Sequence, residues 1–229
     1  MTRPADEEQR LAQERYFEGR DLPPLPIRLL GRAGSRLIVS APRLWSLIRR
    51  PNEALWNRLA GSWDERIRPD SAEHLAPLLA GCEHLEGTPG RILELGTGTG
   101  AGAIALARRY GHAEVLGVDV SEVMVSAARA KGPDELAGRL AFAVADAAAL
   151  PYEEGAFELV AQLNMPPFLD EVVRVLAPGG HVVVADSLGA STPSHVPERL
   201  LRRGCERRGL EVVASDHAGA GTFLVARRP

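Results

Sequence analysis

The stretch that decides the fold is Arg91–Tyr110, RILELGTGTGAGAIALARRY. It begins with a short apolar run, passes through three alternating glycines and ends in alanine-rich sequence that favours a helix. This order predicts a buried strand, a tight turn and a helix. Because glycine has no Cβ, a ligand can lie against the backbone of the turn. The amides that open the helix have no intrahelical partners, which favours a nucleotide-like ligand bearing a carboxylate or phosphate.

The glycines alone leave the identity of that ligand open. Gly96, Gly98 and Ala101 also satisfy the dinucleotide fingerprint G-x-G-x-x-G/A, so a nicotinamide dehydrogenase is one alternative and a structural turn is another. Glu94 stands in the predicted strand, where an apolar residue would be expected. A buried carboxylate needs a partner, and the cationic amino group of a methionine-derived ligand would be one.

The segment Glu94–Gly100, ELGTGTG, resembles motif I of the class I S-adenosylmethionine (SAM)-dependent methyltransferases, including those of the ubiquinone/menaquinone type. Two later segments, AVADAAALPY and RVLAPGG, resemble further sequences of that family, and the resemblance covers about residues 90–228. It implies SAM as the cofactor. The residues of the turn that it assigns to cofactor binding are Glu94, Gly96, Thr97, Gly98 and Gly100.

Two further acids follow predicted strands. Asp119 ends a strand about 20 residues beyond the turn, where a carboxylate can accept hydrogen bonds from both ribose hydroxyls; dehydrogenases share this feature. Asp146 follows the predicted strand Leu140–Ala145, and a helix cap is the alternative reading of this acid. The resemblance implies that Asp146 accepts from the adenine amine and that the amide of Ala147 meets the ring. Val120 completes this predicted side of the cofactor site.

The acceptor is expected beside the strand Phe157–Leu163, because ligands of open α/β sheets bind at the carboxyl ends of strands. Asn164 is expected on the cofactor, and Met165 and Phe168 on the acceptor. Trp63 resembles an aromatic residue that edges the active site in ubiquinone/menaquinone-type enzymes; packing at a core edge is the alternative. Met165 interrupts a superficial likeness to an Asn-Pro-Pro-aromatic motif, so no catalytic role follows from it. The catalytic residue stays unknown, with His195 as a candidate base.

The whole pattern predicts an α/β fold with a Rossmann-like, seven-stranded sheet. The sheet is mostly parallel with an antiparallel C-terminal strand, helices cover both faces, and a helical N-terminal extension precedes it. We expect residues 1–70 to form that extension, a candidate substrate lid, and residues 71–229 to form the methyltransferase domain. Within the extension, residues 1–20 are expected to be a frayed helix or disordered arm and Leu22–Pro26 to be extended. Ser40 is expected to cap a second helix, and Pro51 to start a third.

Composition excludes several classes of function. The 229 residues carry a net charge of −3, so the molecule as a whole does not attract nucleic acid, and DNA is not an expected partner. The two cysteines have no metal-ligand spacing, and no metal is expected. No apolar run approaches bilayer length and no signal peptide is recognisable, which together predict a cytoplasmic protein.

The predicted function is methyl transfer from SAM to a small molecule by in-line displacement. An RNA methyltransferase and a non-catalytic SAM-binding interaction protein are the alternatives. The arginine-rich segment between Arg28 and Arg50 suits either peripheral contact with an anionic membrane or plain solvent exposure. The sequence leaves the acceptor and the oligomeric state open.

Overall fold

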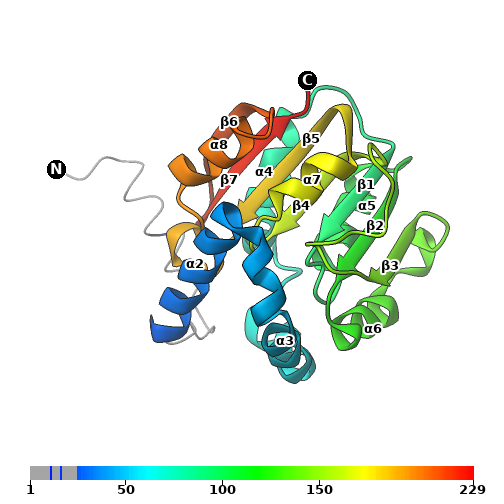
Figure 1. Cartoon of the computed structure of the whole chain (residues 1–229). Helices are drawn as coiled ribbons and strands as arrows, with labels where there is room; N and C mark the ends of the chain where they lie inside the picture. Colours follow the sequence, from blue (N-terminus) through cyan, green and yellow to red (C-terminus); the bar gives the residue numbers. More distant parts are fainter. Residues whose placement is uncertain (1–10, 12–15, 17–24) are drawn as a thin grey trace.

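The computed structural model describes Leu11, Tyr16 and residues 25–229, with side chains in the last range described from Leu29 onward. The expectations for residues 1–20 and for most of Leu22–Pro26 therefore lie outside the described residues. A seven-stranded sheet with the order β3-β2-β1-β4-β5-β7-β6 forms the centre of the molecule (Figure 1). The strands are β1 (Arg91–Leu95), β2 (Glu114–Asp119), β3 (Leu140–Val144), β4 (Phe157–Leu163), β5 (Leu176–Asp186), β6 (Glu211–Ala218) and β7 (Gly221–Arg227).

The strand directions confirm the predicted topology. β1 pairs in parallel with β2 and β4, β2 with β3, and β4 with β5, whereas β7 is antiparallel to β5 and β6. Two residues, Gly219 and Ala220, join β6 to β7, and so short a connection allows only an antiparallel pair. β5 begins earlier than predicted: its first residue, Leu176, pairs with Phe157 before the register shifts and resumes at His181.

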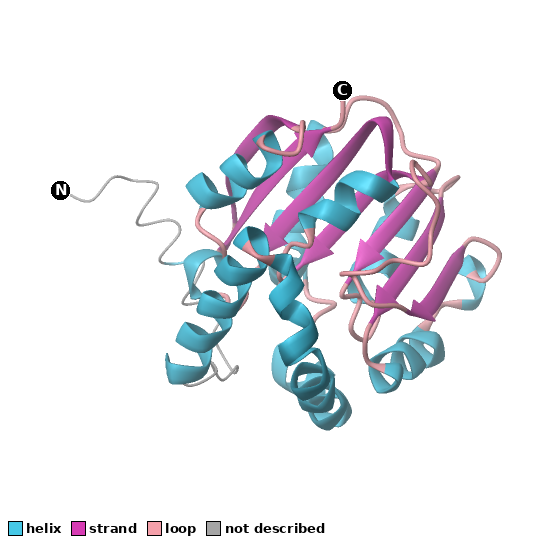
Figure 2. Ribbon diagram, viewed as in Figure 1, coloured by secondary structure: helices cyan, strands magenta, loops and turns pink. Residues whose placement is uncertain are grey.

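Helices cover both faces of this sheet (Figure 2). Leu78, Leu106 and Val125 pack on one face, and Val172 and Leu201 pack on the other, so α4, α5 and α6 lie opposite α7 and α8. Along β4, the residues Leu159 and Ala161 face the first layer and Val160 faces the second, as the period of a strand requires. The helices of these layers are α4 (Ala72–Gly81), α5 (Ala101–Arg109), α6 (Glu122–Lys131), α7 (Leu169–Val175) and α8 (Glu198–Glu206), with short 3₁₀ turns η2 (Cys82–His84), η3 (Asp134–Leu136) and η4 (Gly189–Ser191).

The N-terminal extension consists of α2 (Leu25–Ser40), the 3₁₀ turn η1 (Pro42–Leu44) and α3 (Trp45–Ile67). Two boundary predictions were wrong. Ser40 is the last residue of α2 rather than a cap, and α3 continues through Pro51 instead of starting there. A proline inside a helix costs about 3 kcal/mol. α3 tolerates it because contacts on both sides of Pro51, by Trp45 and by Asn57, hold the helix against the sheet domain.

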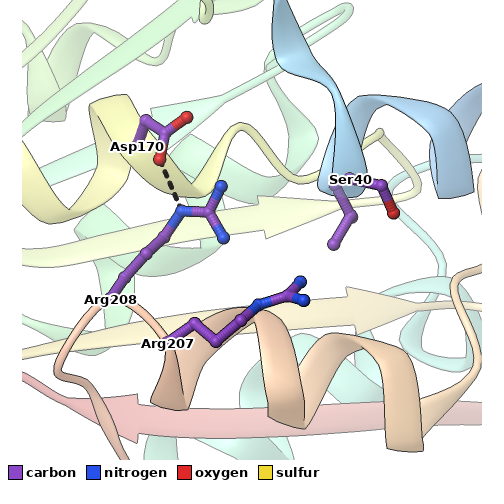
Figure 3. Close-up of a pocket in the computed structure, with 5 residues that line it drawn as sticks. Ser40, Asp170, Arg207 and Arg208 are labelled. Atoms are coloured by element: carbon purple, nitrogen blue, oxygen red, sulfur yellow. Dashed lines mark hydrogen bonds and ion pairs between the residues drawn. The ribbon is translucent and has the colours of Figure 1, made fainter.

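The end of α2 sits against the second helical layer. Val39 is buried in the core shared with α7 and α8. Beside it, Arg208 of the segment after α8 donates to Asp170 of α7 at 2.5 Å, and a cavity of about 360 Å³ opens between this pair, Ser40 and Arg207 (Figure 3). This packing fixes α2 beside the carboxyl end of the sheet.

None of the helices in the described part of the chain combines the length and the apolar character needed to cross a bilayer.

Candidate active site

The glycine turn between β1 and α5 has a backbone that suits only glycine. Gly96, Gly98 and Gly100 have φ values of +67°, +53° and +92°. At Gly100 a Cβ would also lie 2.9 Å from the ring of Phe142, so a side chain is excluded on both grounds. The amide of Thr97 donates to the carbonyl of Val118 at 2.9 Å, which ties the turn to the end of β2. The turn is thus a fixed stretch of backbone at the carboxyl edge of the sheet.

Glu94 lies beneath this turn and is 2% exposed. Its carboxylate accepts a hydrogen bond from Thr97 Oγ1 and one from the amide of Ala103, while burial raises its pKa to about 7. Gly102 leaves room for it, since a Cβ there would overlap the carboxylate. All of these polar contacts are with the chain itself. Direct contact of Glu94 or of the Thr97 side chain with a ligand stays a prediction.

Asp119 ends β2 directly beside the turn. One carboxylate oxygen accepts from the amide of Gly98 at 3.0 Å, and the other accepts from the amide of Ser121 at 2.9 Å. Burial raises the pKa of Asp119, and the backbone donors oppose that rise. Because a carboxylate has about four acceptor sites, lone pairs remain for further donors such as ribose hydroxyls. Val120 follows it and is half-buried.

Asp146 follows β3, accepts hydrogen bonds from two donors and forms an ion pair with a third residue. Its Oδ1 accepts from Trp45 Nε1 and from the amide of Ala148, both at 2.9 Å, and its Oδ2 lies 3.2 Å from Arg49 Nε. Trp45 and Arg49 belong to α3, so the N-terminal extension reaches the carboxylate predicted to bind adenine. A cavity of about 310 Å³ opens beside these three residues.

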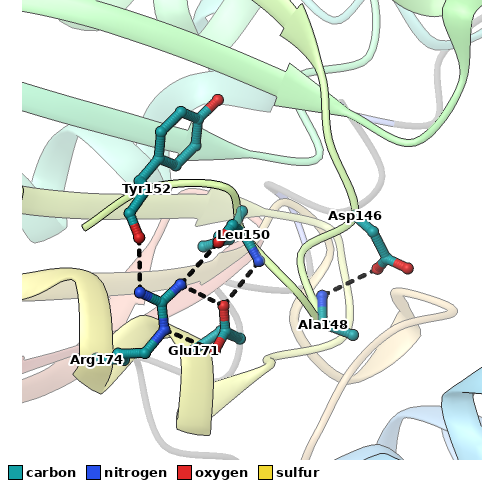
Figure 4. A network of polar contacts seen from close by, with 6 residues as sticks. All are labelled: Asp146, Ala148, Leu150, Tyr152, Glu171 and Arg174. Carbon is teal, nitrogen blue, oxygen red and sulfur yellow. Dashed lines mark hydrogen bonds and ion pairs between the residues drawn. The ribbon is translucent and has the colours of Figure 1, made fainter. Parts of the chain in front are cut away.

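A second network holds the loop after Asp146 in place (Figure 4). Arg174 donates to both carboxylate oxygens of Glu171 and to the carbonyls of Leu150 and Tyr152. Glu171 in turn accepts from the amide of Leu150 at 2.7 Å, and the paired Arg174 lowers its pKa. Figure 4 shows this pair beside the loop that carries Asp146, and its contacts hold that loop at Leu150 and Tyr152.

α3 crosses the loops that follow β1 and β2. Asn57 accepts from Ser121 Oγ at 2.5 Å, Asp64 accepts from Thr99 Oγ1 at 2.6 Å, and Lys131 Nζ lies 2.6 Å from Asp64. Trp63 lies over the turn, with its Nε1 4.0 Å from where a Cβ of Gly98 would stand. The sequence analysis found Trp63 but missed the other residues of α3, because isolated polar residues of a helix give no signal of what they will contact.

The predicted acceptor residues gather with residues of the extension. Met165 covers Gly96, since its Sδ would be 2.7 Å from a Cβ at that glycine. Phe168 meets Trp45 edge to face, with ring centroids 5.1 Å apart, and Ile38 completes a buried cluster that Met165 and Ala147 flank. This end of the site is therefore mainly apolar.

Two further polar residues lie near the carboxyl ends of strands: Asn164 directly follows β4, and His195 lies beyond the end of β5. Asn164, at φ +58°, accepts from the amide of Ser187 at 2.7 Å and donates to Ser187 Oγ at 2.9 Å, so its amide joins the two strand ends. His195 Nδ1 lies 2.8 Å from Asp186 Oδ2, and burial raises the pKa of this aspartate. A carboxylate that orients an imidazole in this way is typical of a general base, but it is also a common structural pair.

The fold and the site together define a Rossmann-like nucleoside-binding domain. A glycine turn follows the first strand, and acids follow the second and third, all at one edge of the sheet. Residues 92–180 match a family described as a methyltransferase domain.

Comparisons with individual proteins agree with this match. The chain is 44% identical over 110 residues to a demethylmenaquinone methyltransferase of Thermus thermophilus, covering 44% of this chain and 49% of the relative. It is 35% identical over 178 residues to a trans-aconitate 2-methyltransferase of Methylobacterium radiotolerans, covering 74% and 61%. The chain thus spans roughly half of these relatives' length. A solved SAM-dependent methyltransferase of Aquifex aeolicus shares the fold, with a TM-score of 0.60 at 18% identity over 76% of this chain and 98% of that one.

These matches, together with the fold, indicate a class I SAM-dependent methyltransferase. The site fits the family's cofactor. The turn leaves its backbone uncovered by side chains of its own, Asp119 keeps acceptor capacity, and carboxylates rather than cations follow β2 and β3. Dehydrogenases share the acid after β2, so the second acid, Asp146 after β3, and the family match are what favour a sulfonium nucleoside over a dinucleotide.

Proposed function

We propose that the chain transfers a methyl group from SAM to a small-molecule acceptor with an apolar body, by in-line displacement. The observation that supports this most is the set of three acids, Glu94, Asp119 and Asp146, in or after three neighbouring strands around one glycine turn. Bound SAM supplies a methyl group on a sulfonium with a good leaving group. The chain's own task is then to position the reactants and to exclude water.

Each predicted residue has a role in this proposal. Asp119 accepts from the ribose, Asp146 and the Ala147 amide hold the base, and Val120 flanks the ring. The glycines allow the cofactor to approach their backbone because they carry no Cβ, and Glu94 and Thr97 fix the turn from below. Asn164 joins the strand ends on the cofactor side, and Trp63 with Met165 covers the turn.

The nature of the acceptor end supports an apolar acceptor. Phe168, Trp45 and Ile38 form a buried apolar cluster beside Met165. One relative is named for demethylmenaquinone and another for trans-aconitate, so the family spans apolar and acidic acceptors. The arginines that line the cavity beside Asp146, namely Arg43, Arg49 and Arg50, would suit an acidic acceptor molecule instead.

Calorimetric titration with S-adenosylhomocysteine tests the cofactor assignment. We expect micromolar binding, weakened about 30-fold or more in Asp119→Ala, because a charge-assisted hydrogen bond contributes roughly 1.5–3 kcal/mol. Asp134→Ala, at an exposed acid of η3, is the matched control and should bind as the native chain does. The absence of heat at millimolar ligand would contradict the assignment.

An acceptor panel with labelled SAM tests the rest of the proposal. We expect label on quinol or phenol acceptors with an apolar body. Transfer to trans-aconitate alone would keep the methyltransferase activity and overturn the apolar acceptor. Cofactor binding without transfer to any member of a broad panel would favour the non-catalytic alternative.

A further inference from the structure

Large apolar side chains are exposed mainly on one region of the molecule. Of the eleven such residues in the described part of the chain, seven belong to α2, η1 and α3. Leu30 and Leu47 are 76% and 73% exposed, the highest values among them. A concentration of this kind marks an interaction site, whereas scattered single residues do not. The seven are Leu29, Leu30, Leu37, Leu44, Leu47, Ile48 and Leu55.

On α2 these residues share one face. Leu29, Leu30 and Leu37 follow helical spacing and are exposed, whereas Ile38 and Val39 are buried against the domain. The helix therefore has two apolar faces. One packs on the protein, and the other has no partner in the described part of the chain.

The start of α3 continues this surface. Ser46–Pro51 is exposed at every position, and only Trp45 in that first turn is buried. Figure 1 shows α2 and α3 together at the edge of the sheet toward which the arrow of β5 points. We give the name α2–α3 surface to the exposed large apolar and arginine side chains of α2, η1 and the start of α3, without Arg49, which pairs with Asp146: Leu29, Leu30, Arg36, Leu37, Arg43, Leu44, Leu47, Ile48 and Arg50.

The charge of this region is opposite to that of the whole chain. Residues 25–52 contain six arginines and no acid, although the net charge of the chain is −3. Arg36, Arg43 and Arg50 are exposed, and within the described residues none of them forms an ion pair. Arginine beside exposed leucine is the composition of helices that lie in the interface of anionic membranes.

We propose that the α2–α3 surface binds an anionic lipid bilayer, with its leucines in the outer acyl region and its arginines on lipid phosphates. A second copy of the chain fits this surface poorly, because a two-fold contact would bring the same arginines together. RNA would use the arginines but would leave the leucines in water. Docking by this surface would place the acceptor end of the site, where Trp45 meets Phe168, next to the lipid phase.

Vesicle flotation with the full chain tests this inference. We expect binding to phosphatidylcholine vesicles that contain phosphatidylglycerol, little binding to phosphatidylcholine alone, and release by high salt. Leu30→Asp/Leu47→Asp should reduce the partition coefficient about tenfold or more, since each leucine loses its burial in lipid. Arg36→Glu/Arg50→Glu should reduce it by a similar factor.

The matched control is Val123→Asp/Val213→Asp, at side chains that are 45% and 43% exposed outside this surface. It adds the same charge and should bind vesicles almost as the native chain does. Equal loss in this control, equal binding to neutral vesicles, or no binding to any vesicle would overturn the proposal. So would a shift from dimer to monomer in Leu30→Asp/Leu47→Asp, measured by light scattering. Because the leucine variant should still bind S-adenosylhomocysteine, failure here is distinguishable from failure of the proposed activity.

Discussion

The glycine turn and the N-terminal helices differ in how closely the chain packs around most of their glycines. At Gly102 an added Cβ would overlap Glu94, and at Gly100 it would meet Phe142. In the N-terminal helices, nothing lies within 4 Å of the same position at Gly34 of α2 or Gly61 of α3, whereas at Gly31 of α2 it would stand 2.6 Å from the carbonyl oxygen of Pro193. The glycine turn and the first turn of α5 are thus packed to the point where Gly100 and Gly102 are required, whereas α2 and α3 are packed as closely only around Gly31. The glycines of the turn and of the start of α5 are therefore specified by core residues such as Phe142 and Glu94, and the extension has fewer such contacts.

The largest expected effect is at Gly102. Gly102→Ala would drive a methyl group into the buried Glu94 carboxylate, and overpacking of this kind costs roughly 1–3 kcal/mol. We expect the free energy of unfolding to fall by about 3 kcal/mol in urea denaturation, despite the better helix propensity of alanine. Gly111→Ala, where nothing lies within 4 Å, is the control. Equal stability of the two variants would show that the turn is no more tightly packed than a surface loop.

A second prediction concerns pH. Burial raises the pKa of Glu94 from 4.5 to about 7, so the folded chain binds this proton more tightly than the unfolded chain does. The resulting stabilisation is complete below about pH 4.5 and is lost as the pH rises to about 7. Between pH 5 and pH 8 this group alone should lower the free energy of unfolding by about 2–3 kcal/mol. Glu94→Gln should flatten that part of the pH profile, and an unchanged slope would contradict the assignment.

A third prediction sharpens the link between the two regions. Trp45→Phe keeps an aromatic ring beside Phe168 but removes the N–H that donates to Asp146. If Asp146 accepts from the adenine amine, Trp45 competes with the ligand for this carboxylate, and its loss as a donor should tighten binding of S-adenosylhomocysteine about threefold. A threefold change corresponds to somewhat less free energy than the roughly 1 kcal/mol that a typical hydrogen bond contributes. Isothermal calorimetry measures the change. Weaker binding would mean that Trp45 holds Asp146 in place rather than competing for it.

The smallest expected effect is at Gly61 of α3. Since nothing lies within 4 Å, Gly61→Ala should add about 0.5–1 kcal/mol of helix stability. Amide hydrogen exchange should show slower exchange within α3, with α5 unchanged. Faster exchange would mean that Gly61 has a packing role and that the extension is as tightly packed as the turn.

The sequence predicted the sheet domain well because its signals are local. β4 has the predicted bounds, and the antiparallel β7 follows from the two-residue connection after Ala218. The order of glycines and acids predicted that the turn, Asp119 and Asp146 lie together at one edge of the sheet, and the structure places them there. That order did not identify Arg174 as the residue that fixes the loop after Asp146, because that contact joins positions more than 20 residues apart.

The sequence by itself determined the strand–turn–helix unit, the parallel sheet and the nucleoside type of ligand, since each depends on residues that are close together along the chain. Only the tertiary structure decided where Glu94 points, which donors Asp146 receives, and how α3 lies across the strand ends. Such features depend on contacts between distant segments, and a helix that continues through Pro51 shows that these contacts can outweigh a strong local preference.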